Sequence, residues 1–91
     1  MKKIIVTYDC GTKENRDGFY AALERLNMSG LCEKEEGCLG SKYYFPTFDD
    51  TKLLLVELWE SEDNLTLHKQ QPHFMKMLKI KEKMNVITSA I

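Results

Sequence analysis

The sequence predicts an α+β fold whose elements follow one another in the order β-α-β-β-α-β. Segments rich in β-branched and aromatic residues occur near both ends of the chain and twice in its middle, bounded by Gly, Pro or Asp. Between them lie two segments in which apolar residues recur at helical spacing. With 91 residues, 43% of them hydrophobic and 30% charged, we expect one globular domain over residues 1–91 with a thin core.

The first third of the chain predicts a strand followed by a helix. Residues 2–10, KKIIVTYDC, are of strand type. Thr12 can then cap a helix that ends at Ser29 and Gly30. Charged residues of this helix, Arg16 among them, are expected in water. Its apolar stripe has the spacing i, i+3, i+4, i+7 and consists of Phe19, Ala22, Leu23 and Leu26.

The middle of the chain predicts a β-hairpin. A polar connection, residues 33–37, leads into CLGSKYYFP, residues 38–46. A turn at Asp49 and Asp50 then leads into KLLLVELWE, residues 52–60, which is the strongest strand pattern in the chain.

The last third predicts two short helical segments and a closing strand. Ser61 can cap a helix over about 61–69, and Pro72 suits the first turn of its continuation over 72–83. Residues 84–91, MNVITSAI, are expected to form a closing strand. This order corresponds to the split βαβ, ferredoxin-like plan, an antiparallel four-stranded sheet with helices on one face. Four side chains within residues 72–83 are expected to point inward: Phe74, Met75, Met77 and Leu78.

The strand at 52–60 is apolar on both faces. Residues 53–56 are continuously apolar, and Leu58 and Trp59 extend the run beyond Glu57. Because the helices cover one face of the sheet, we expect a second copy of the chain on the other, giving a homodimer through the sheet face. The alternative is a monomer with an unusually apolar exposed sheet.

Composition and charge exclude several classes of protein. The net charge is −1, and the lysines near residues 76–83 have the spacing of a solvated helix face, so no nucleic acid partner is expected. The sequence shows neither a membrane-spanning apolar run nor a secretory signal, which favours a cytoplasmic protein. Cys10, Cys32 and Cys38 are expected to be reduced thiols, at least two of them buried.

Three stretches together resemble the antibiotic biosynthesis monooxygenase family, whose members include quinol monooxygenases. They are EEGCLGSKYY at 35–44, VELWES at 56–61 and LHKQQPHF at 67–74. The resemblance implies a dimeric α+β barrel in which two ferredoxin-like sheets pair face to face, and a pocket between the sheet and helices of each protomer. It favours the quinol monooxygenase-like branch and a small aromatic substrate.

The candidate chemistry requires a base and a dry pocket. No GxGxxG, P-loop, paired-cysteine or His-x-x-x-His pattern occurs, so we expect no flavin, nicotinamide or metal cofactor. A deprotonated hydroquinone or phenol can itself supply electrons to dioxygen. His68, three residues after Leu65 on the predicted helix, is the candidate catalytic base. A structural histidine bonded to a backbone carbonyl is the other interpretation.

Five further residues are candidates for substrate binding. Trp59 could form a wall for an aromatic ring, although it could equally be core packing. His73 follows Pro72 at a helix start, where a structural role is also open. Tyr8, Tyr43 and Phe45 line the same pocket if their strand faces point towards the helices.

Two other functions remain open from the sequence. The helix segment is also similar to that of family members that isomerise a small phosphorylated hydroxy-ketone. That reaction would use His68 or His73 as a proton shuttle and needs cations for the phosphate, of which Lys69 is the nearest in sequence. A non-catalytic dimer that binds a small ligand is the third interpretation.

Overall fold

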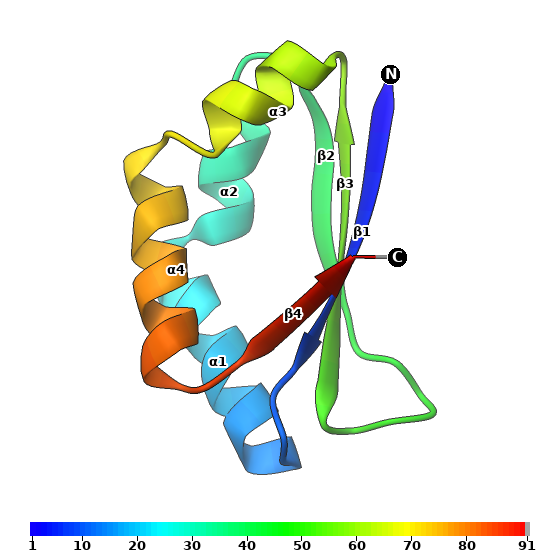
Figure 1. The fold of residues 1–91 in the computed structure, drawn as a ribbon, viewed down its shortest axis with the longest axis vertical. Helices are drawn as coiled ribbons and strands as arrows, with labels where there is room; N and C mark the ends of the chain where they lie inside the picture. The colour runs from blue at the N-terminus through cyan, green and yellow to red at the C-terminus, as the bar shows by residue number, and fades with distance from the viewer. Residues whose placement is uncertain (91) are drawn as a thin grey trace.

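The computed structural model describes residues 1–90 and confirms the expected order, with each helical segment divided in two (Figure 1). The elements are β1 (Lys2–Asp9), α1 (Lys13–Leu26), α2 (Met28–Glu33), β2 (Cys38–Tyr44), β3 (Lys52–Trp59), α3 (Glu62–His68), α4 (Pro72–Lys83) and β4 (Ile87–Ala90).

The four strands form one antiparallel sheet in the order β2-β3-β1-β4. The central strands β1 and β3 pair over their whole length, from Lys2 opposite Trp59 to Asp9 opposite Lys52. Within residues 1–90, the helices lie on one side of this sheet (Figure 1). The fold is therefore the ferredoxin-like α+β arrangement that the sequence predicts.

The first helical segment differs from the prediction, because it does not end at Ser29 and Gly30. Asn27 ends α1 in a left-handed conformation with φ 59°, and its N–H bonds to the carbonyl oxygens of Leu23 and Glu24. A second helix, α2, then begins at Met28. Ser29 and Gly30 lie inside this second helix, so the polar connection to the hairpin is shorter than expected.

The second helical segment agrees closely with the prediction. The Ser61 hydroxyl caps α3 by accepting a hydrogen bond from the N–H of Asn64, and α4 begins at Pro72. Met77 is buried, but the inward orientation expected for Met75 is wrong, since 52% of that residue is exposed. The closing strand is confined to Ile87–Ala90, and residue 91 lies outside the described part of the chain.

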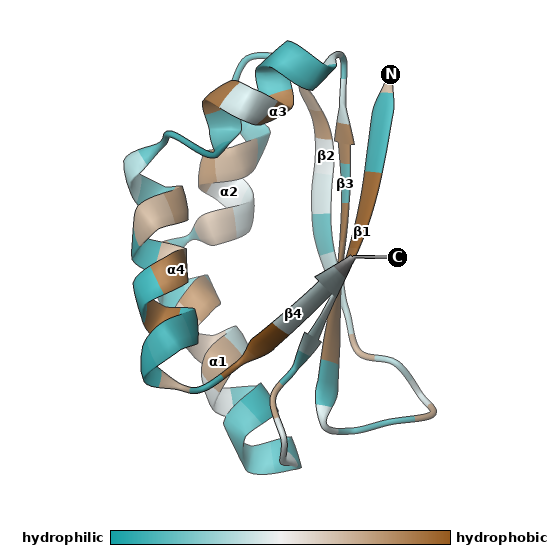
Figure 2. Cartoon of the chain, in the orientation of Figure 1, coloured by the Kyte–Doolittle hydropathy of each residue, from teal (hydrophilic) through white to brown (hydrophobic). Residues whose placement is uncertain are grey.

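The apolar core lies between the sheet and the helices. Phe19 and Leu23 of α1 pack with Leu53 of β3, and all three are almost completely buried. Apolar and polar residues alternate along the helices, as expected for helices with one face on this core (Figure 2). Arg16, expected in water, is instead 7% exposed and places its guanidinium carbon 4.6 Å from the centre of the Phe45 ring.

The outer face of the sheet is apolar at its centre. Leu54, Val56 and Leu58 alternate with buried residues along β3 and are only partly buried, and Ile5 lies opposite Val56. Within residues 1–90, none of the helices combines the length and apolar character needed to cross a lipid bilayer.

Candidate active site

A cavity of about 300 Å³ lies between the inner face of the sheet and helices α3 and α4. The exposed surface of its lining is mostly apolar, although about half of the lining residues carry a polar group. This composition is typical of a site for a small organic molecule. The apolar lining includes Ile4, Val6, Leu55, Leu65, Phe74 and Met77, and the polar lining includes Tyr8, Tyr43, Glu57, His68, Lys69 and Lys81.

His68, the last residue of α3, is at the wall of this cavity and is only 2% exposed. Its Nδ1 atom lies 2.7 Å from Oε2 of Glu35. The backbone carbonyl expected under the structural interpretation is therefore not its partner. The ring is held between Trp59 and Phe74, with centroid distances of 4.8 and 5.1 Å.

Glu35 joins two histidines that lie on either side of the α3–α4 turn. The same Oε2 atom that contacts His68 lies 2.7 Å from Nε2 of His73. A backbone hydrogen bond from the N–H of Glu35 to the carbonyl of Cys32 closes a turn at the end of α2. Pro72 opens α4, so that His73 occupies the second position of the new helix.

Glu57 is a buried carboxyl group on the inner face of β3, 5% exposed. Its oxygens accept hydrogen bonds from the Trp59 indole N–H at 3.5 Å and the Ser41 hydroxyl at 3.4 Å. Its Oε2 lies 3.7 Å from Nε2 of His68, which is long for a hydrogen bond. Burial raises the pKa of Glu57, and the neighbouring His68 opposes that rise.

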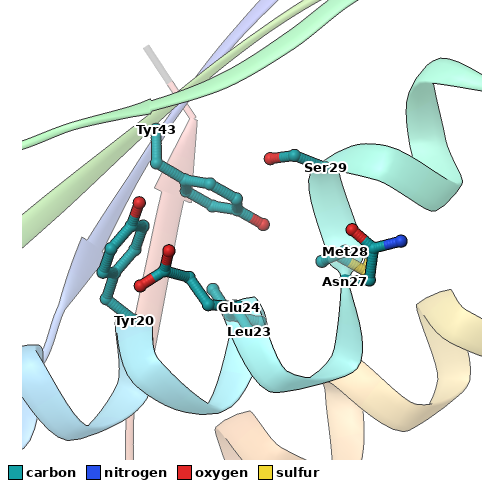
Figure 3. A pocket seen from close by; sticks show the side chains of 7 residues that line it. All are labelled: Tyr20, Leu23, Glu24, Asn27, Met28, Ser29 and Tyr43. Carbon is teal, nitrogen blue, oxygen red and sulfur yellow. The ribbon is translucent and has the colours of Figure 1, made fainter.

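Two of the aromatic candidates line the cavity, as expected for an inward orientation. Tyr8 of β1 is 3% exposed, and Tyr43 of β2 lies over the junction of α1 and α2. Burial raises the pKa of both phenols, so they remain neutral at ordinary pH. Tyr43 also borders a smaller hollow of about 160 Å³, where Tyr20 and Glu24 lie beside it (Figure 3).

The other three candidates lie outside the cavity. Trp59 is completely buried behind His68. His73 borders a separate surface depression with Glu35. Phe45 follows β2 and is 49% exposed, with its ring against Tyr20 and Arg16. Of the six candidate residues, the structure therefore places His68, Tyr8 and Tyr43 around one cavity.

Cys32 lies beside the two histidines and Glu35. The sulfur atom, the two ring nitrogens and a carboxylate oxygen all lie within 4.8 Å of one another. All three cysteines are free thiols, with Cys10 and Cys32 buried as expected. The cluster therefore brings together side chains that can bind metals, although the sequence predicts no metal site.

The comparison with protein families identifies the chain. The model of the antibiotic biosynthesis monooxygenase family matches residues 1–79. The chain belongs to this family. Known structures agree in fold: a conserved protein of unknown function from Bacteroides thetaiotaomicron superposes with a TM-score of 0.84 at 19% identity, covering 98% of this chain and 90% of that one.

Two further structures carry the name of the family. A Nitrosomonas europaea protein, provisionally named an antibiotic biosynthesis monooxygenase, has a TM-score of 0.80 at 16% identity, with 99% and 94% of the two chains covered. Another antibiotic biosynthesis monooxygenase has a TM-score of 0.73 at 16% identity, with 99% and 96% covered. Among curated proteins, none shows significant sequence similarity to this chain. At these identities the solved structures support the fold.

Sequence reasoning missed Glu35, Glu57 and Cys32 in this family member. Glu57 offered a signal, because a single acidic residue interrupts an otherwise apolar strand, and such a residue needs buried partners if it points inward. Glu35 carried no comparable signal, since it is one of several acidic residues in a polar connection. Only the turn after α2 places its side chain between the two histidines.

Proposed function

We propose that this protein is a cofactor-independent monooxygenase that oxidises a small quinol-like or phenolic aromatic molecule. The observation that carries the proposal is the buried His68 imidazole at the wall of a largely apolar cavity, with Nδ1 held by Glu35. Membership of the antibiotic biosynthesis monooxygenase family supports the reaction class.

The proposed reaction begins with removal of a proton. Glu35 accepts the hydrogen of Nδ1, so the neutral ring of His68 has its free lone pair on Nε2. That nitrogen takes the proton of a substrate hydroxyl, and the resulting anion reacts with dioxygen. One oxygen atom enters the ring and the other leaves as water, so a hydroquinone becomes a hydroxyquinone and supplies all the electrons. The apolar lining limits the access of water to the anion.

The other residues have supporting roles in this proposal. Tyr8 and Tyr43 contact the substrate ring from the sheet side. Trp59 and His73 act through His68, since Trp59 packs against its ring and His73 shares its carboxylate. Phe45 has no role here because it lies outside the cavity.

Oxygen uptake with a panel of hydroquinones, in buffer treated with a chelator, tests the proposal. His68→Gln should lower the rate by about 10²–10⁴-fold, the usual contribution of a general base. Glu35→Gln should also lower it, whereas its exposed neighbour Glu36→Gln should keep the wild-type rate. Equal background rates for wild type and His68→Gln, with both proteins folded by circular dichroism, would contradict the proposal.

We also propose that the protein works as a homodimer through the outer face of the sheet. Leu54, Val56 and Leu58 form an apolar centre that the helices leave uncovered within residues 1–90. Light scattering should give twice the 10.6 kDa mass of one chain. Val56→Lys should yield a monomer, because it places a charge at the centre of the interface. A wild-type monomer at micromolar concentration would refute this arrangement.

One observation favours the isomerase as a second candidate function. Lys81 joins Lys69 at the edge of the cavity, so two cations, rather than the one expected from the sequence, could hold a phosphate. This candidate predicts that a phosphorylated hydroxy-ketone exchanges a carbon-bound proton with solvent, measured by NMR. Lys81→Met should weaken the binding of that substrate more than it lowers oxygen uptake with a hydroquinone.

A further inference from the structure

We propose that the protein has a binding site for a divalent transition metal ion of the zinc type, with four protein ligands: Cys32, Glu35, His68 and His73. The inference goes beyond the proposed oxygenase activity and does not rest on it. It rests on the convergence of four donor atoms of the kinds that zinc prefers, all within 4.8 Å of one another.

The spacing of the donors is close to that of a tetrahedral site. Bonds of about 2.0–2.3 Å to zinc place neighbouring ligand atoms roughly 3.3–3.8 Å apart. On metal binding, the two 2.7 Å distances from the Glu35 oxygen to the histidine nitrogens would lengthen slightly. The longer distances between donor atoms would shorten. Shifts of about 1 Å or less suffice, which side-chain rotation can supply.

The ligands come from two short segments of the chain. Cys32 and Glu35 are joined by a backbone-bonded turn at the end of α2. His68 and His73 are separated by four residues across the α3–α4 turn, which is within the His-x₃₋₅-His spacing of many structural zinc sites. A metal ion would therefore tie together two parts of the fold that are 33 residues apart in sequence, as counted from Glu35 to His68.

The surroundings also suit a metal site. A histidine that binds a metal through one nitrogen commonly donates its other N–H to a carboxylate. Glu57 occupies that position, with its Oε2 3.7 Å from Nε2 of His68. A small rotation of the ring would complete this hydrogen bond.

The charges of the cluster balance when a dication is present. The thiolate of Cys32 and the carboxylate of Glu35 together carry two negative charges. In the metal-free protein, burial and the charges of Glu57 and Glu35 raise the pKa of the Cys32 thiol, so the metal must displace its proton. With four protein ligands and little exposure, the site is closed and of the structural type, without an open position for substrate or dioxygen.

The metal and the proposed oxygenase reaction make opposite demands on His68. A metal on Nδ1 leaves the ring proton on Nε2, where the base needs a free lone pair. Zinc should therefore inhibit oxygen uptake while stabilising the fold. Because metal binding is measured without substrate, its result stands whether or not the protein proves to be an oxygenase.

Cobalt(II), a coloured substitute for zinc, tests the ligand set directly. Reduced protein, freed of metal by a chelator, should bind one equivalent of Co²⁺ with the intense visible bands of four-coordinate cobalt and a near-ultraviolet sulfur-to-cobalt band. Cys32→Ser should lose the sulfur band, and Cys38→Ser, a matched cysteine outside the cluster, should retain it. A weak spectrum typical of six water or carboxylate ligands, unchanged by Cys32→Ser, would overturn the proposal.

Zinc affinity measured by competition with a coloured chelator gives a second, quantitative test. Glu57→Gln should weaken zinc binding by about 10–100-fold, as outer carboxylate partners usually do, and loss of a direct ligand by His73→Gln should weaken it more. Glu36→Gln should change it by less than about 3-fold, because surface substitutions rarely act at a distance. Equal affinities for wild type, His73→Gln and Glu36→Gln would show that zinc binds elsewhere and refute the site.

Discussion

The inner face of β3 has two halves of opposite character. Leu53 and Leu55 lie in the apolar core beside α1, whereas Glu57 and Trp59 lie in a polar cluster with His68 under α3 and α4. All four residues point the same way because strand side chains alternate. One strand can therefore serve packing in one half and chemistry in the other.

The two halves depend on different forces. In the apolar half, stability comes from the area removed from water and from close packing, which tolerate small changes of orientation. In the polar half, a buried carboxyl group is tolerable only where donors meet it, so the geometry is directional. Trp59 and Ser41 supply those donors to Glu57.

In the apolar half, Leu53→Ala should have the largest effect on stability. The side chain is completely buried, so its truncation leaves a cavity and should lower the free energy of unfolding by about 3–5 kcal/mol. Leu39→Ala is the matched control, since Leu39 is 51% exposed and should cost less than about 1 kcal/mol. Urea unfolding measures both. Similar losses for the two variants would show that the apolar half is not tightly packed.

In the polar half, Glu57→Leu should cost about 1–3 kcal/mol even though it adds apolar surface. The substitution leaves the indole N–H of Trp59 and the hydroxyl of Ser41 without an acceptor. Glu57→Gln keeps an acceptor oxygen and should cost less. Fluorescence of Trp59, the single tryptophan, follows the unfolding of metal-free protein in urea. A leucine variant more stable than the glutamine variant would mean that these hydrogen bonds contribute little.

The loop that carries Glu35 into the polar half depends on Gly37. This residue has φ 81°, and an added Cβ would collide with the side chain of Asn64 in α3. Gly37→Ala should therefore lower stability by about 1–2 kcal/mol. Gly40→Ala, where an added Cβ meets nothing within 4 Å, is the control and should be close to neutral. Thermal unfolding compares the two variants, and equal melting temperatures would show that the conformation of the loop does not require Gly37.

The smallest expected effect appears only at alkaline pH. Burial raises the pKa of the Tyr43 phenol above its ordinary value of 10.0. Above pH 10 the unfolded chain loses this proton while the folded chain retains it, so stability falls as the pH rises towards the folded pKa. The loss should reach about 1 kcal/mol one pH unit above 10.

Tyr43→Phe should reduce this loss of stability at alkaline pH, as measured by urea unfolding at pH 10 and one unit above it. Tyr44→Phe is the control, because Tyr44 is the next residue along the strand and is 50% exposed. A pH dependence that is the same in both variants and in wild type would show that the Tyr43 phenol does not contribute.

Local patterns predicted most of the fold. The strand runs, the Ser61 cap and the position of Pro72 each act over a few residues, and the structure confirms them. The division of α1 from α2 was missed because Ser29 and Gly30 usually end helices, whereas the left-handed Asn27 does so here. Met75 was misplaced because a helix with neighbouring apolar residues does not specify how far its buried face extends.

The candidate site was only partly predictable, because local patterns do not specify contacts between distant residues. Hydrophobic spacing and helix capping are local properties, so the amino-acid sequence alone predicts the ferredoxin-like order of elements and a helix that carries His68 beside the sheet. The packing of distant segments brings Glu35, Cys32 and His73 to His68 and places Glu57 behind it. These residues are far apart in sequence, and they meet because the α2–β2 loop packs against the α3–α4 turn. A pattern that spans only a few residues cannot predict how two such distant segments pack.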